Sequence, residues 1–142
     1  MKERYIVIPP DKWRNFIDIA FDNSKYFSIT LFSDCLSSSK PEYEYMINEL
    51  NPWIIDKSEA VWGEYEKKFY LCNYFTKKIL LSVNGIDMFG DMFGKGKYPD
   101  DLCFYNDMGM WFENISHERT SFIILPECRM IDELKENGIM IF

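Results

Sequence analysis

The sequence is poor in the residues that catalytic and metal sites use most often. It contains a single histidine, His117, among 142 residues, and histidine is the commonest general base and metal ligand. Four cysteines are present without any CxxC spacing, at Cys35, Cys72, Cys103 and Cys128. This spacing does not indicate a zinc site. We therefore expect free, buried thiols in a reducing compartment, with no metal and no cofactor.

Long apolar runs are also absent. The run near the N-terminus covers only Tyr5–Ile8 and is followed by two prolines, which is too short for the core of a signal peptide. No stretch approaches the ~18 consecutive apolar residues that a membrane-spanning helix needs. The sequence therefore predicts a cytoplasmic protein without membrane contact.

Phosphate-binding loops are not matched either. The segment Gly90–Lys97 resembles a Walker loop, but its spacing is one residue short and Gly96 occupies the place of the required hydroxyl residue. Carboxylate pairs are plentiful and could serve acid–base chemistry or a divalent cation. A solvated acidic face explains them without further assumptions.

Positive charge is scarce, with 16 basic against 23 acidic residues and a net charge of −7. Residues 81–142 contain five basic and eleven acidic residues. Such a chain repels nucleic acid backbones, whose binding depends on Lys and Arg. The charge instead favours a basic protein partner, for which it would first raise the association rate.

The apolar content is that of a folded protein, with 47% apolar and 18% aromatic residues. The length suits one domain. We predict a single α+β domain over residues 1–142, with about three helices packed on a mostly antiparallel sheet.

Helical spacing is clearest after Pro9 and Pro10. Apolar residues there recur on one helical face, namely Trp13, Phe16, Ile17, Ala20 and Phe21. A second helix is predicted from the capping-box spacing of Ser39 and Glu42 to Leu50, and a third over 126–138. Residues 76–83 are compatible with a further short helix.

Strands are predicted where β-formers cluster. The predicted segments are 4–8, 25–32, 53–55, 60–62, 69–75, 102–105, 110–115 and 122–125, with 139–142 either a last strand or a docked tail. Residues 63–66 are predicted as a turn. Asn106–Gly109 is predicted as a hairpin connection.

A candidate binding surface lies in residues 85–118. Long irregular loops are often functional, and residues 85–97 contain a near-repeat of Asp-Met-Phe-Gly. Aromatic anchors beside charge are typical of protein interfaces. The alternative is a glycine-rich connection whose Phe and Met side chains pack into the core. The candidate partner-binding residues are Asp87, Asp91, Phe93, Asp100, Asp101, Asp107, Trp111 and Glu113, with Glu64 and Glu66.

Alternation along the strand 110–115 predicts that Trp111, Glu113 and Ile115 share one face. An enzyme would have to use His117. Its neighbour Ser116 points to the opposite face of an extended chain, so a Ser–His pair is not formed by these two residues. We expect His117 to have a structural role.

Four blocks of the sequence resemble one group of small cytosolic proteins of Bacillus-type bacteria. The blocks are Tyr5–Trp13, Ser37–Leu50, Asp101–Tyr105 and Ile115–Glu118. Some members of this group are labelled stage III sporulation protein AH, a label that implies a membrane-anchored ring component. The chain is also similar to the immunity proteins encoded beside the wall-associated contact-dependent toxin of Bacillus.

The resemblance implies a cytosolic antidote that binds the toxin's C-terminal nuclease domain, which acts on transfer RNA. It assigns no residue roles, because immunity families share no binding motif. The alternatives are a small hydrolase or nucleotide-handling enzyme that uses His117 with Glu118 or a cysteine, and a sporulation-related scaffold protein.

Overall fold

The computed structural model describes residues 3–32, 41–59, 65–82, 100–115, 118–124 and 128–142. The helices are α1 (Trp13–Asp22), α2 (Pro41–Leu50), α3 (Tyr74–Leu81) and α4 (Cys128–Glu136), with short 3-10 turns at Pro10–Lys12 and Asn51–Trp53. The strands are β1 (Glu3–Val7), β2 (Tyr26–Phe32), β3 (Ile54–Glu59), β4 (Tyr65–Leu71), β5 (Asp100–Asn106), β6 (Gly109–Ile115), β7 (Thr120–Ile124) and β8 (Met140–Ile141).

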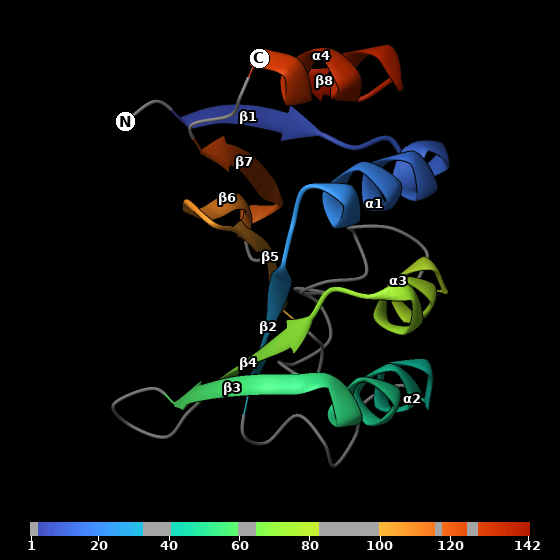
Figure 1. Ribbon diagram of the computed structural model, residues 1–142, viewed down its shortest axis with the longest axis vertical. Helices are drawn as coiled ribbons and strands as arrows, with labels where there is room; N and C mark the ends of the chain where they lie inside the picture. The colour runs from blue at the N-terminus through green and yellow to red at the C-terminus, as the bar shows by residue number, and fades with distance from the viewer. Residues whose placement is uncertain (1–2, 33–40, 60–64, 83–99, 116–117, 125–127) are drawn as a thin grey trace.

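The strands form one sheet in the order β3-β4-β2-β5-β6-β7-β1-β8, and every described pair is antiparallel. The helices line up on one side of the sheet as α4, α1, α3 and α2, to the right in Figure 1. In the described part of the chain no helix covers the opposite side, which we call the helix-free face. The predicted α+β domain is confirmed, with four helices rather than about three.

The core lies between the helices and the sheet, and α1 is its centre. The predicted apolar stripe is confirmed, since Trp13, Phe16, Ile17 and Ala20 are all buried. Phe16 is fully buried, and its ring lies 4.9 Å from that of Phe112. Helix α1 therefore holds the sheet through aromatic contacts that start from its own sequence periodicity.

Turn and cap signals near the C-terminus are confirmed. Asn106 pairs with Gly109 across Asp107 and Met108, and Gly109, which closes the hairpin, has a positive φ of 110° that glycine adopts without strain. Helix α4 is followed by Gly138 at φ 82°, with the Ile139 amide donating to the Leu134 carbonyl. The tail then forms β8 against β1.

The predicted strand over 69–75 is too long, because it ends at Leu71. Asn73 caps α3 instead: its side chain accepts from the Thr76 amide at 2.9 Å, and the Thr76 hydroxyl accepts from the Asn73 amide at 3.0 Å. This capping box overrides the strand preference of the aromatic residues that follow. The predicted turn over 63–66 is wrong at its end, since β4 already begins at Tyr65.

The predicted alternation on β6 is broken by a bulge. Phe104 pairs with Phe112 but Tyr105 pairs with Met110, so Trp111 is an extra residue in the ladder. Trp111 is only 3% exposed, and its ring stacks on Phe104 at 6.0 Å. Its indole N–H donates to the Ser24 hydroxyl at 2.8 Å. Trp111 therefore belongs to the core and does not share the environment of Glu113.

None of the described helices is long and apolar enough to cross a bilayer.

Candidate functional site

The residues singled out from sequence are spread over several parts of the molecule. Trp111 is buried and offers no ring to a partner. Asp100 starts β5. Four of the predicted binding residues lie outside the described residues, namely Glu64, Asp87, Asp91 and Phe93. Ser116 and His117 also lie outside them.

Two of the predicted acidic residues are paired within the chain. Asp107, exposed at the hairpin tip, forms an ion pair with Lys25 and raises the pKa of that lysine. Glu66 lies 3.4 Å from Lys68. On β4, Glu66 and Lys68 alternate with Lys67, so they point to the helix-covered side. These carboxylates therefore do not form one acidic surface with Glu113.

Strand register brings a different set of residues together on the helix-free face. Side chains that alternate with the buried core positions line up across six strands. Ser28 pairs with both Phe69 and Cys103, and Glu113 lies next to Cys103 and Phe122. The resulting row runs Phe69, Ser28, Cys103, Glu113, Phe122 and Tyr5.

Glu113 is the electrostatic centre of this row. Its pKa is raised by partial burial and by the charges of Glu3 and Asp101, while Lys67 lowers it. Asp101 adopts a left-handed φ of 44° where β5 shifts register against β2. The carboxylates of Glu3 and Asp101, from two other strands, thus act on Glu113.

Sequence reasoning identified Asp101 and Glu113 but missed Glu3 and Lys67. A partial signal for Glu3 is present, because the β1 residues Glu3, Tyr5 and Val7 alternate with buried Ile6. That alternation shows which face Glu3 occupies, but not which strand lies beside it. The pairing of β1 with β7 joins residues more than a hundred positions apart.

Aromatic rings flank the polar middle of the row on both sides. On the β2–β4–β5 side, Tyr26 stacks on Tyr105 with ring centres 4.8 Å apart, and Phe69 lies 5.6 Å from Tyr105. On the β1–β7 side, Tyr5 lies 4.9 Å from Phe122 and is 56% exposed. The helix-free face therefore combines charge with accessible aromatic surface, as protein interfaces do.

Polar groups beneath these rings are held in unreactive forms. The Ser28 hydroxyl is hydrogen bonded to the Tyr105 hydroxyl at 2.9 Å and is fully buried. Burial raises the pKa of the Cys103 thiol to about 11, so it is protonated at neutral pH. The pKa of Lys67 is raised, because Cys103, Tyr105 and Glu113 outweigh the effect of its burial. At neutral pH neither Cys103 nor Lys67 is therefore in the deprotonated form that a nucleophile needs.

Metal binding finds no support in the described ranges, which contain no group of three or more His, Cys, Asp or Glu side chains placed to hold an ion. The charges of Glu3 and Asp101 act on Glu113, but the three carboxylates do not form such a group.

No family model, curated protein or solved structure matches this chain.

Proposed function

We propose that the protein is an immunity protein that binds and neutralises the basic C-terminal nuclease domain of a contact-dependent toxin, one molecule to one, without turnover. The observation that carries the proposal is the helix-free face, where Glu3, Asp101 and Glu113 lie together between exposed or half-buried aromatic rings. The net charge of −7 adds long-range attraction to a basic domain.

The electrostatics of Glu113 explain why a cationic partner would bind here. Like charges and burial make its ionised form costly in the free protein, and Lys67 offsets this only in part. An incoming Arg or Lys beside Glu113 would favour the ionised form of that carboxylate. Tyr5 and Phe122 supply adjacent apolar contact area.

The decisive experiment is co-purification with the protein encoded immediately upstream, together with an RNA-cleavage assay. We expect a one-to-one complex in which cleavage is abolished. Absence of a complex, together with absence of protection in cells that express the neighbouring protein, would overturn the proposal. Loss of a measured catalytic activity in His117→Ala alone would instead favour a small hydrolase or nucleotide-handling enzyme.

A matched pair of variants tests the surface itself. Glu3→Gln with Glu113→Gln removes two negative charges from the helix-free face. Glu133→Gln with Glu136→Gln removes two from α4, in the helix layer, so the net charge changes equally. We expect the first pair to weaken the complex at least about tenfold and the second to change it less than about threefold. Equal effects would show that only overall charge matters and that this face is not the interface.

A further inference from the structure

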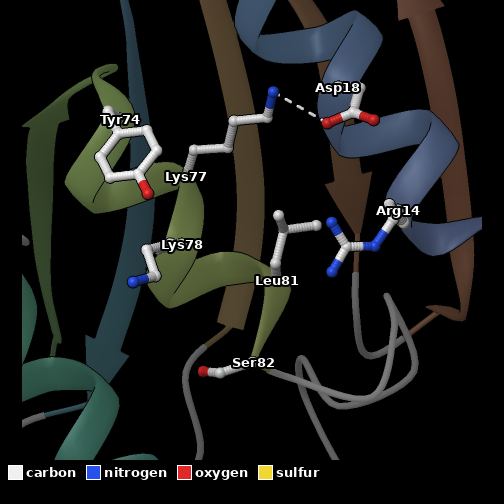
Figure 2. Close-up of a pocket in the computed structure, with 7 residues that line it drawn as sticks. All are labelled: Arg14, Asp18, Tyr74, Lys77, Lys78, Leu81 and Ser82. Atoms are coloured by element: carbon white, nitrogen blue, oxygen red, sulfur yellow. Dashed lines mark ion pairs between the residues drawn. The ribbon is translucent and has the colours of Figure 1, made fainter.

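A second surface feature lies in the helix layer, away from the helix-free face. A groove of about 470 Å³ runs between α1 and α3, and Figure 2 shows the side chains that line it. Its volume falls within the range of small-molecule sites, roughly 300–1,000 Å³. The lining residues are Arg14, Asp18, Tyr74, Lys77, Lys78, Leu81 and Ser82.

Helical spacing places these side chains along the groove. Tyr74, Lys77, Lys78 and Leu81 occupy positions i, i+3, i+4 and i+7 of α3, which form one helical face. On the other wall, Arg14 and Asp18 are four residues apart on α1.

A buried hydrogen bond holds the two walls together. The Trp13 indole on α1 donates to the Leu80 carbonyl on α3 at 3.0 Å. The groove is therefore formed by two helices that are fixed to each other at their buried sides.

The groove is positively charged although the chain as a whole is acidic. Lys77 is paired with Asp18 at 2.8 Å, across one end of the groove. Lys78 lies 5.8 Å from the centre of the Tyr74 ring. Among the described residues Arg14 makes no ion pair and no hydrogen bond, and Figure 2 shows it extending toward Leu81. Two cations, Arg14 and Lys78, are thus left without an acidic partner in the described structure.

We infer that this groove binds a free nucleoside monophosphate. The Arg14 guanidinium offers the planar fork that matches a phosphate, and Lys78, which lies beside Tyr74 in Figure 2, adds positive charge to the groove as a whole. The Tyr74 ring, which is 69% exposed, offers a flat surface on which a base can stack, and Leu81 adds apolar lining. The phosphate and the ring therefore each have a place in one groove.

The net charge favours a mononucleotide over a nucleic acid strand. A long strand would carry many phosphates across a molecule of net charge −7, and repulsion would grow with its length. A mononucleotide brings two negative charges at most to the groove and leaves the acidic surface uncontacted. This inference does not depend on the proposed function, because the residues proposed to bind the toxin lie on the opposite side of the sheet.

Titration of the full chain with AMP and GMP, followed by calorimetry and by NMR shifts of α3 amides, tests the inference. We expect binding in the range of 10 μM to 1 mM, with inorganic phosphate and the unphosphorylated nucleoside each at least tenfold weaker. Phosphate that binds as tightly as the nucleotide would overturn the inference in favour of a simple anion site. A 5′-phosphorylated RNA 10-mer that binds more tightly than AMP would overturn it in favour of an RNA site, and absence of any binding would also overturn it.

Single substitutions locate the site. Arg14→Gln and Lys78→Gln should each weaken AMP binding about tenfold, and Tyr74→Leu should weaken AMP but not inorganic phosphate. Lys135→Gln on α4 removes the same charge from an exposed position outside the groove and should leave binding unchanged. Thermal melts check that all four variants are folded. An Arg14→Gln variant that is folded and binds AMP normally would overturn the assignment, as would equal losses in Arg14→Gln and Lys135→Gln.

Discussion

The two faces of the eight-stranded sheet are made by the same strands, yet the side chains at their centres differ in chemistry. On the helix-covered face, Phe27, Phe104 and Phe112 are fully buried in an apolar core. On the helix-free face, the alternate positions hold hydroxyl, thiol and carboxyl groups, as at Ser28 and Glu113. We infer that most of the free energy gained from packing comes from the helix-covered face. The other face is left to carry charge.

The largest expected effect comes from truncating the helix-covered side. Phe16→Ala removes a fully buried ring that contacts Phe104 and Phe112. We expect it to lower the free energy of unfolding by about 3–5 kcal/mol. Tyr5→Ala on the helix-free face removes a half-exposed ring and should cost less than about 1 kcal/mol. Urea denaturation measures both; similar losses would mean that the faces do not differ in their contribution to stability.

The next effect concerns thiol reactivity. Because burial raises the pKa of Cys103 to about 11 and that of Cys72 to about 12, few of these thiols are ionised at pH 8. An unfolded thiol has a pKa near ~8.5. Alkylation of both sites at pH 8 should therefore be at least about 100-fold slower in the folded protein than in urea. Mass spectrometry of the peptides that contain each cysteine measures the labelling rates. Rapid labelling of Cys103 alone would show that reagents reach this thiol from the helix-free face.

The difference between the faces also explains what could be predicted from the sequence. The apolar stripe of α1, the hairpin at Asn106–Gly109 and the cap at Gly138 each follow from residues close together in the chain. Local periodicity and turn chemistry determine such features. The helix-covered core could be predicted because its apolar residues repeat at regular intervals along the sequence.

The helix-free face could not be predicted in the same way. Its charge cluster joins Glu3 to Glu113 through pairings of β1 with β7 and of β7 with β6, and no local pattern specifies that register. The bulge at Trp111 turned a predicted surface residue into a core residue. Likewise, Asn73 ended β4 early and started α3, and so created one wall of the groove.

A smaller effect tests whether neighbouring polar side chains on the helix-free face are energetically coupled. Ser28→Ala and Tyr105→Phe each remove one side of the 2.9 Å hydrogen bond between their hydroxyls. In a double-mutant cycle we expect a coupling free energy of about 0.5–1.5 kcal/mol, measured by chemical denaturation. Additive losses in the free energy of unfolding would show that the two hydroxyls contribute independently to stability.

The smallest expected effect concerns the charge of Glu113 on the helix-free face. The pKa of Glu113 is raised in the folded protein by burial and by Glu3 and Asp101, with Lys67 opposing. The folded state therefore binds this proton more tightly than the unfolded state does, and stability falls as pH rises from the unfolded pKa through the folded one. At neutral pH, Glu113→Gln should be more stable than the unmodified protein by less than about 1 kcal/mol after solvent screening. Thermal melts should show this gain vanishing as the pH falls below about 4.

The same substitution separates a binding residue from a structural one. If the charge of Glu113 serves a cationic partner, Glu113→Gln should stabilise the free protein and weaken the complex at the same pH. A carboxylate with a purely structural role would change the stability of the free protein and leave the affinity of the complex unchanged. Glu136→Gln on α4 removes an equal charge from an exposed helix position and controls for net charge. A Glu113→Gln variant that is destabilised at pH 7 would mean that attraction to Lys67 outweighs repulsion from Glu3 and Asp101. In that case the helix-free face would be electrostatically satisfied without a partner.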